Sequence, residues 1–131
     1  MINRVVLDTN ILVSALWSAN GNEARLLRMF IDGEILICYC TQMLIEYKNV
    51  LRRPRLSLNE AMVNIVLHYI RDEGFLVEVI PSEIPFRDES DRKFFDVAIA
   101  CEAILITGNR KHFPDHPAIM STTQYLAVIV Q

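Results

Sequence analysis

Glycine, cysteine and long apolar runs are all scarce in this sequence of 131 residues. The four glycines leave little room for flexible linkers, and the sequence contains no internal repeat or low-complexity tract. We therefore expect one domain over residues 1–131, because this length is near the common size of a single domain. No apolar run approaches the roughly 20 residues that span a bilayer, and the first one is too short for a signal peptide. A cytoplasmic protein is therefore expected.

Positive charge is also in short supply, because 13 Lys and Arg stand against 16 Asp and Glu. The net charge of -3 argues against a protein that coats nucleic acid through an overall positive potential, although a local basic path is compatible with it. Hydrophobic residues make up 52% of the chain and charged residues 22%, a balance typical of a compact fold and too apolar for disorder. The chain is expected to fold by itself or as an oligomer.

The few cysteines form no paired framework. Cys38, Cys40 and Cys101 are odd in number, which favours reduced, buried thiols over disulfides. The alternative is a zinc site that combines Cys38 and Cys40 with His112 and His116. Because a C-x-C pair lacks the usual spacing of zinc ligands, we set zinc aside.

Short apolar strands alternate with helical patterns along the chain. The predicted strands are 4–8, 35–39, 76–80, 104–107 and 118–121. The predicted helices are 22–32, a helix capped by Thr41 that ends before Pro54, one that follows Asn59 and runs to about Glu73, and one from Asp91 to about Ala103. This alternation predicts an α/β sandwich with a mostly parallel central sheet. Such sheets carry their chemistry at the carboxyl ends of the strands.

Three acidic side chains are candidates for that chemistry. Asp8 ends the first strand, Glu46 borders the apolar stripe of its helix, and Asp91 opens a helix where the backbone dipole favours its ionised form. Each has an ordinary alternative, because Asp8 can simply cap a helix that starts near Asn10 and the other two can be a solvated or a capping acid. Asp96 projects about 140° away from Asp91 on a helix, so we expect it to be exposed to solvent.

Polar groups after a later strand can complete the site. Gly108 permits a tight turn between Thr107 and Asn109, which emerge at another strand end. Oxygen donors that converge from several strand ends suit Mg²⁺ or Mn²⁺. A bound cation would neutralise a phosphate, stabilise a leaving oxygen and lower the pKa of an attacking water. The predicted reaction is therefore hydrolysis of a phosphodiester bond.

In this order, Asp8-Thr9-Asn10, Glu46-Tyr47, Asp91-Arg92-Lys93-Phe94 and Thr107-Gly108-Asn109 resemble the motifs of the PIN-domain family. The resemblance covers nearly the whole chain and looks closest to the prokaryotic toxin components of toxin-antitoxin pairs, related to the VapC ribonucleases. It implies a three-layer α/β/α sandwich and an Mg²⁺- or Mn²⁺-dependent endonuclease for single-stranded RNA, often a homodimer. The three acids that match the family's catalytic and metal-binding positions are Asp8, Glu46 and Asp91.

The resemblance also assigns supporting roles. Asn109 stands at the family's fourth acidic position, which removes one negative charge and puts a second tightly held metal in doubt. Thr107 would be a polar helper near the metal, and Asn10 would orient Asp8. The candidates to neutralise RNA phosphates are Arg52, Arg53, Arg92, Lys93, Arg110 and Lys111. A second copy of the chain or an antitoxin would cover apolar surface that remains at residues 125–130.

Two rival interpretations remain. A phosphoryl-transfer enzyme of the haloacid-dehalogenase type would need a second aspartate two residues after Asp8, where this chain has Asn10. The sequence contains no Gly-rich phosphate loop either. The other rival is a catalytically weak PIN-like module that binds RNA or a protein, which Asn109 makes plausible. The RNA target and any toxicity stay open.

Overall fold

The computed structural model describes residues 3–129. Its strands are β1 (Arg4–Leu7), β2 (Leu36–Tyr39), β3 (Phe75–Leu76), β4 (Ile104–Ile106) and β5 (Ile119–Met120). Its helices are α1 (Thr9–Trp17), α2 (Asn22–Ile31), α3 (Thr41–Leu51), α4 (Glu60–Glu73), α5 (Arg92–Cys101) and α6 (Thr122–Ile129). Short 3-10 helices are η1 (Pro54–Leu56), η2 (Glu89–Asp91) and η3 (Arg110–His112). Strands and helices thus alternate, as expected.

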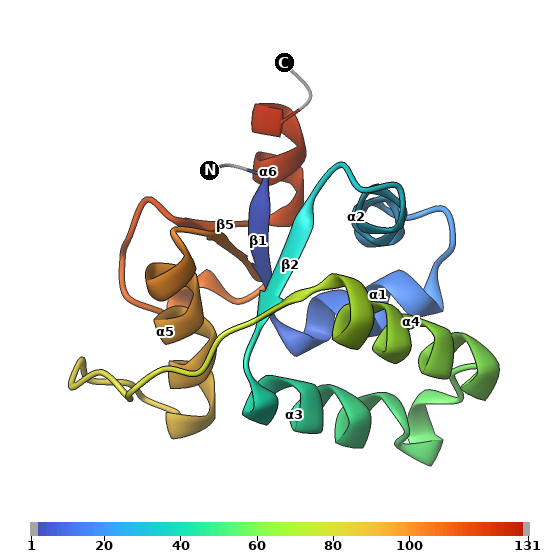
Figure 1. The fold of residues 1–131 in the computed structure, drawn as a ribbon, viewed down its shortest axis with the longest axis horizontal. Helices are drawn as coiled ribbons and strands as arrows, with labels where there is room; N and C mark the ends of the chain where they lie inside the picture. Colours follow the sequence, from blue (N-terminus) through green and yellow to red (C-terminus); the bar gives the residue numbers. More distant parts are fainter. Residues whose placement is uncertain (1–2, 130–131) are drawn as a thin grey trace.

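The five strands form one parallel sheet in the order β3-β2-β1-β4-β5. Figure 1 shows α5 on one side of β1 and β2, and α1, α3 and α4 on the other. The α/β class and the α/β/α sandwich are therefore confirmed. The connections reverse direction at β1, because β2 and β3 follow on one side of it while β4 and β5 follow on the other. Open α/β sheets bind ligands at such a reversal, outside the carboxyl ends of the strands.

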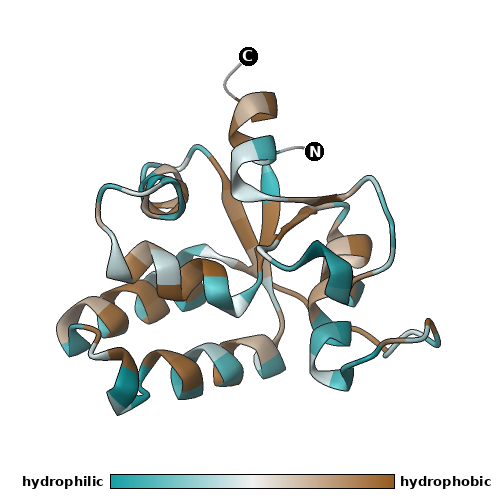
Figure 2. Cartoon of the chain, turned by 180° about the vertical axis from the view of Figure 1, so that it is seen from behind, coloured by the Kyte–Doolittle hydropathy of each residue, from teal (hydrophilic) through white to brown (hydrophobic). Residues whose placement is uncertain are grey.

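Burial explains why short strands hold the centre of the molecule. Val5, Val6 and Leu7 of β1 are completely buried, as is Ile37 of β2. Figure 2 shows the hydrophobic residues concentrated on the strands and on the helix sides that face them. Neighbouring strands need no alternation of polar and apolar residues, because helices cover both faces.

The predicted helices after residues 22, 41, 59 and 91 are confirmed within two or three residues. Asn59 caps α4, since its Oδ1 accepts a hydrogen bond from Met62 N at 3.1 Å. The cap expected at Thr41 is wrong, because Thr41 is the first residue of α3 and its Oγ1 donates to Glu78 instead. Gly33 follows α2 with a φ of 78°, a left-handed conformation that favours glycine at a helix end. The helix α6 was not predicted, and α1 was expected only as the alternative role of Asp8. Helix α1 is buried at Ile11, Leu12 and Val13, so its apolar surface is too wide for an amphipathic pattern.

The exposure predicted for Asp96 is wrong. This side chain is only 8% exposed, and its Oδ2 accepts a hydrogen bond from Ser82 N at 2.9 Å. The strand expected over 76–80 is likewise cut short, because β3 ends at Leu76. The chain that follows runs without regular structure past α5 (Figure 1). This segment contacts the side of α5 that carries Asp96, which helical periodicity alone predicts to face solvent.

Two further expectations can be compared with the structure. Cys38, Cys40 and Cys101 are buried and free, as expected for reduced thiols packed in a core. Within residues 3–129, no helix has both the length and the apolar character needed to cross a bilayer.

Candidate active site

Asp8 lies at the carboxyl end of β1. Its backbone N–H donates to Ile106 O of β4 at 3.0 Å, although Asp8 itself follows the last residue of β1. Asp8 is the N-cap residue of α1 by position, yet its carboxylate makes no capping hydrogen bond. Instead Oδ2 accepts a hydrogen bond from Thr107 Oγ1 at 2.7 Å. Since Thr107 follows β4 and is completely buried, this bond joins the carboxyl ends of two adjacent strands.

Burial raises the pKa of Asp8 above its ordinary value. Hydrogen bonds from Thr107 and from the backbone of Thr9 act in the opposite direction, because they stabilise the ionised carboxylate. The negative charge of Glu46 raises this pKa further, while His112 lowers it. Asp8 therefore lies within electrostatic reach of both α3 and η3.

Glu46 extends from α3 and connects three helices. Its Oε2 accepts a hydrogen bond from Thr9 Oγ1 at the start of α1. Its Oε1 forms an ion pair with Lys93 Nζ of α5 at 2.7 Å, and the two side chains are only 27% and 14% exposed. Both carboxylate oxygens of Glu46 are thus held by groups of this chain.

Tyr47, the next residue along α3, fastens this helix to the sheet. Its hydroxyl donates to Leu7 O, the last residue of β1, at 2.5 Å. The side chain is completely buried, and burial together with the charges of Asp8 and Glu46 raises the pKa of Tyr47. The phenol therefore stays a neutral donor that holds Glu46 at the end of β1.

Asp91 occupies the turn where η2 passes into α5. Its Oδ2 is buried and has no hydrogen-bond partner among residues 3–129; His112 Nδ1 lies 3.7 Å from it. Burial is the main cause of its raised pKa, and the negative charges of Asp8 and Asp88 add to it. His112 and Lys93 act in the opposite direction. An unsatisfied buried oxygen next to other carboxylates is a position that favours a cation.

Comparison with known proteins identifies the family of the chain. A family model described as a PIN domain matches residues 4–111, which include all three acids. The chain belongs to the PIN-domain family. A relative from Methanocaldococcus jannaschii, described as an uncharacterized protein, is 30% identical over 110 residues, which are 82% of this chain and 71% of the relative. No solved structure gives a significant match to the chain.

PIN domains are generally nucleases that use divalent metal ions. In the described part of this PIN domain, no three His, Cys, Asp or Glu side chains converge closely enough to hold such an ion. Both carboxylate oxygens of Glu46 are bound by Thr9 and Lys93 instead. The donor set nevertheless fits a hard cation, because Asp91 Oδ2 is unsatisfied and the remaining groups are carboxylate and hydroxyl oxygens. Binding would require Glu46 to exchange Lys93 for the ion.

The polar helpers expected around Asp8 differ in their contacts. Thr107 bonds the Asp8 carboxylate directly, and its Oγ1 also accepts a hydrogen bond from Asn109 N at 2.9 Å. The Asn109 side chain is exposed and makes no hydrogen bond of its own within residues 3–129. Asn10 is also exposed on α1 and makes no hydrogen bond to Asp8 in this part of the chain. The backbone of Asn109, rather than its side chain, therefore supports the Thr107 hydroxyl.

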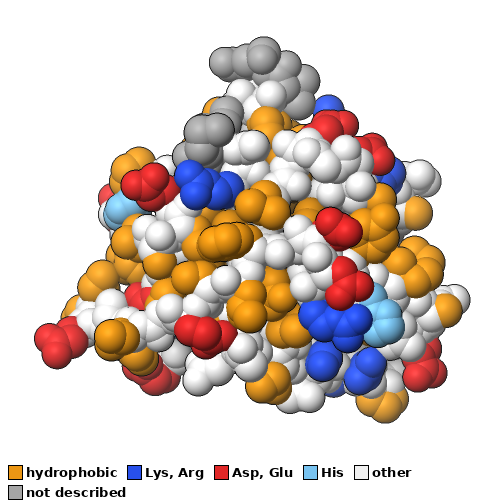
Figure 3. All heavy atoms as spheres, viewed as in Figure 1, with side chains coloured by type: hydrophobic (Ala, Val, Ile, Leu, Met, Phe, Trp, Pro, Cys, Tyr) orange, Lys and Arg blue, Asp and Glu red, His pale blue; other side chains and the backbone are white. Residues whose placement is uncertain are grey.

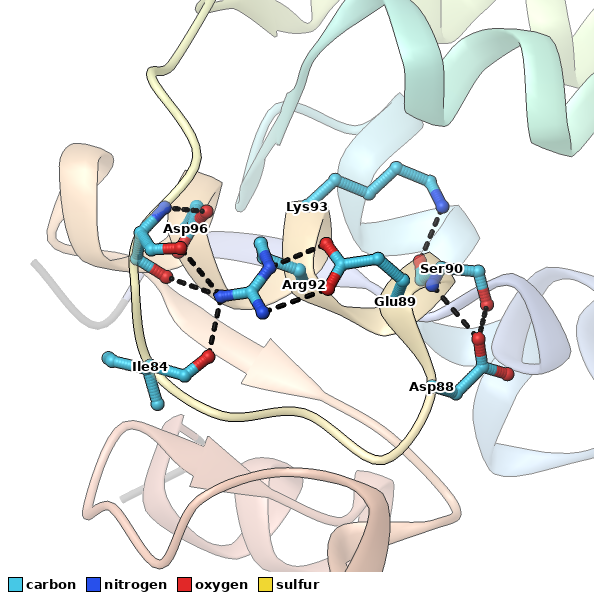
Figure 4. Close-up of polar contacts among 8 residues, drawn as sticks. Ile84, Asp88, Glu89, Ser90, Arg92, Lys93 and Asp96 are labelled. Carbon is cyan, nitrogen blue, oxygen red and sulfur yellow. Dashed lines mark hydrogen bonds and ion pairs between the residues drawn. The ribbon is translucent and has the colours of Figure 1, made fainter.

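Arg92 binds groups of its own chain (Figure 4). Its Nε and Nη2 donate to the Glu89 carboxylate at 2.6 and 2.9 Å. Its Nη1 donates to the backbone oxygens of Ser82 and Ile84 at 2.7 and 2.6 Å, and the guanidinium lies over the Phe86 ring. These contacts hold the irregular segment after β3 against α5. They leave Arg92 poorly placed to bind a phosphate.

The other basic candidates lie in two segments, directly after α3 and in η3. Arg52 bonds Asn64 of α4 at 2.8 Å, Arg53 is exposed beside it, and Arg110 contacts Gln124 at 3.4 Å on the side of η3. Lys111 is also exposed on η3. Figure 3 shows Lys and Arg side chains gathered over α3 and α4, with acidic and apolar side chains interspersed over the rest of that face.

Two side chains of the site have roles that the sequence analysis missed. His112 was considered only as a zinc ligand, yet it stands beside Asp91 and affects the pKa of Asp8. The sequence feature that could have indicated this is its spacing from Asn109. In a 3-10 turn, two residues three positions apart lie on the same side. Lys93 was expected to bind phosphate, and its ion pair with Glu46 was not anticipated. No local pattern reports that pair, because 47 positions separate the partners.

Proposed function

We propose that this protein is a metal-dependent endoribonuclease that hydrolyses phosphodiester bonds of single-stranded RNA. The proposal is carried by one observation: at the carboxyl end of the central strand, the negative charge of Glu46 raises the pKa of Asp8, and the negative charge of Asp8 raises the pKa of Asp91. The burial of Asp8 and the unsatisfied oxygen of Asp91 are costly unless a cation compensates their charge. Family membership supports the same activity.

Asp8 and Asp91, joined by Glu46, are the residues that would hold Mg²⁺ or Mn²⁺. Such an ion supplies positive charge to the attacked phosphate when it is bound. The chain's own residues provide the orientation, since Thr107 fixes the Asp8 carboxylate and Thr9 fixes that of Glu46. Lys93 forms an ion pair with Glu46, and its ammonium would be free to contact a substrate phosphate if Glu46 held the ion.

The finer biological role is also part of the proposal. The motif order supports the toxin component of a toxin-antitoxin pair, acting on RNA in the cytoplasm, with an antitoxin protein as partner. The homodimer expected from the resemblance would need an apolar surface. Ile45 of α3 and Met62 and Ile65 of α4 provide one, since each is about half exposed.

Cleavage of single-stranded RNA tests the activity. We expect the purified protein to cut RNA in Mg²⁺ or Mn²⁺ and not in a chelator, and Asp8→Asn to lose this activity while it keeps its fold. Asp72→Asn is the matched control, because Asp72 is an exposed acid of α4 outside the site. If RNA binds but stays intact with both ions, the binding-module alternative is correct. Equal cleavage by Asp8→Asn would assign the activity to a contaminant.

Exposed arginines next to the site are proposed to bind the RNA backbone. Charge reversal in Arg53→Glu should weaken RNA binding and reduce the slope of log affinity against log salt by about 1 or more. Fluorescence anisotropy at several salt concentrations measures both quantities. An unchanged slope would remove Arg53 from the binding surface.

A further inference from the structure

A cavity of about 510 Å³ adjoins the carboxylates on the α5 side. It lies between the start of α3, the irregular segment after β3 and the start of α5, and Gln42, Val79 and Lys93 are among its lining residues. Asp8, Glu46 and Asp91 are not part of its wall. The cavity is therefore separate from the carboxylate site and linked to it through Lys93, whose Nζ lies 2.7 Å from Glu46. Its volume is in the range of cavities that bind small organic groups.

The charged groups in the cavity wall are paired with groups of the chain itself. Glu78 accepts hydrogen bonds from Thr41 N and Oγ1 at 2.9 and 2.6 Å. Glu89 is bound by Arg92, and the paired groups around Arg92 are drawn in Figure 4. Asp96 accepts from a backbone N–H, as described above. With its cations engaged and three carboxylates in the wall, the cavity is unsuited to a second anion, and a neutral occupant fits it better.

The uncharged part of the wall suits a flat group with a polar edge. Val79 and Pro81 offer apolar surface, and Cys40 lies buried behind them. The Gln42 amide is exposed and makes no hydrogen bond within residues 3–129, so it can donate and accept at the same time. A nucleobase has both properties, an apolar face and an edge of alternating donors and acceptors.

We propose that this cavity receives an unstacked nucleobase of the RNA, next to the phosphate that lies at the carboxylates. Single-stranded RNA is read in this way, because its bases can leave the stack and enter a pocket. Lys93 stands between the two sites, so one nucleotide can place its phosphate near the Lys93 ammonium and its base against Gln42. This inference rests on the proposed ribonuclease function and adds a base-selecting site to it.

Two variants test the cavity. Gln42→Ala removes the free amide, and Val79→Trp fills the space, whereas Asn49→Ala changes an exposed amide of the same helix that does not line it. We expect the wild-type protein to cut a randomised RNA pool with a preference for one base beside the cleaved bond. Gln42→Ala should reduce that preference about tenfold, the usual scale for losing a base-edge contact. Val79→Trp should abolish it, and Asn49→Ala should keep it.

Binding measured in parallel separates the two proposals. Affinities for four single-stranded homo-oligonucleotides, one for each base, should differ in the wild-type protein and become similar in Gln42→Ala and Val79→Trp. If the wild-type protein binds with this preference but never cuts, the ribonuclease proposal fails and the base site stands. Cleavage and binding without base preference, or a preference retained by both variants, would overturn the base site and leave the ribonuclease proposal intact.

Discussion

Replacing Lys93 by methionine tests whether the chain supplies its own cation to the carboxylates. In the present structure Lys93 Nζ is 2.7 Å from Glu46 Oε1, and both side chains are largely shielded from water. Lys93→Met keeps much of the side-chain length and removes the charge. Without the positive charge of Lys93, the negative charges of the acids repel one another more strongly. A divalent ion should therefore bind more tightly, and the metal-free protein should be less stable.

The size of the effect follows from the environment of the pair. Exposed ion pairs contribute about 0.2–1 kcal/mol, whereas a hydrogen bond to a charged group that is shielded from water contributes about 1.5–3 kcal/mol. The Lys93–Glu46 pair lies between these cases, because the two side chains are 14% and 27% exposed. We expect about 1.4 kcal/mol, which corresponds to a roughly tenfold lower Kd for Mn²⁺. The metal-free Tm should fall by about 5 °C.

Isothermal titration calorimetry with Mn²⁺ and thermal unfolding without metal measure the two quantities. Lys48→Met is the control, since Lys48 is an exposed lysine of α3 outside the site and should leave both unchanged. The reasoning would be refuted if Lys93→Met left the Mn²⁺ affinity as it is, or weakened it, while the Tm showed an intact fold. In that case Lys93 would assist the ion rather than compete with it.

Three further predictions concern the neighbours of this pair. Thr107→Val removes a hydrogen bond that lowers the pKa of Asp8, so the acid limb of the pH-rate profile should move to higher pH. If the limb does not move, the group whose ionisation it reports is not Asp8. Because the folded pKa of Asp8 is raised, the contribution of Asp8 to metal-free stability should be greatest below the unfolded value of 3.8 and be lost as pH rises through the folded pKa. Asp8→Asn should therefore raise the metal-free Tm at pH 7 and flatten its pH dependence, and a lower Tm in this variant would contradict the sign. Asn109→Asp restores a fourth acid and should raise the Mn²⁺ stoichiometry in calorimetry from one to two per chain; a stoichiometry that stays at one would show that position 109 is not a ligand.

The sheet was predictable because its strands are short runs of apolar residues that can be recognised in the sequence. An apolar run that ends in Asp8 fits a strand buried on both faces, and parallel strands place their carboxyl ends at one edge. That rule alone brought Asp8 and Thr107 to the same place. The start of α4 was predictable for a similarly local reason, since Asn59 precedes a regular apolar periodicity.

Contacts between distant segments were not predictable in the same way. Helical periodicity predicted that Asp96 is exposed, because periodicity cannot reveal that the segment after β3 returns to contact that side of α5 through Ser82. Arg92 contributes to holding the segment there, because its guanidinium donates to two backbone oxygens of it. The sequence analysis interpreted Arg92 as a phosphate ligand because it is a basic residue next to Asp91. In the structure Arg92 binds the irregular segment after β3 instead.

Charge balance connects these contacts to the number of ions. With the three acids ionised, Asp8, Glu46 and Asp91 contribute three negative charges, and Lys93 contributes one positive charge beside them. The net charge of these four groups is -2, which matches a single divalent ion. The neutral side chain of Asn109 adds no negative charge that would attract a second ion. Hydroxyls of Thr9 and Thr107 orient the carboxylates without changing this balance. In this structure the Lys93 ammonium pairs with Glu46 and so offsets part of the repulsion among the acids, and a divalent ion bound at the proposed site would take its place.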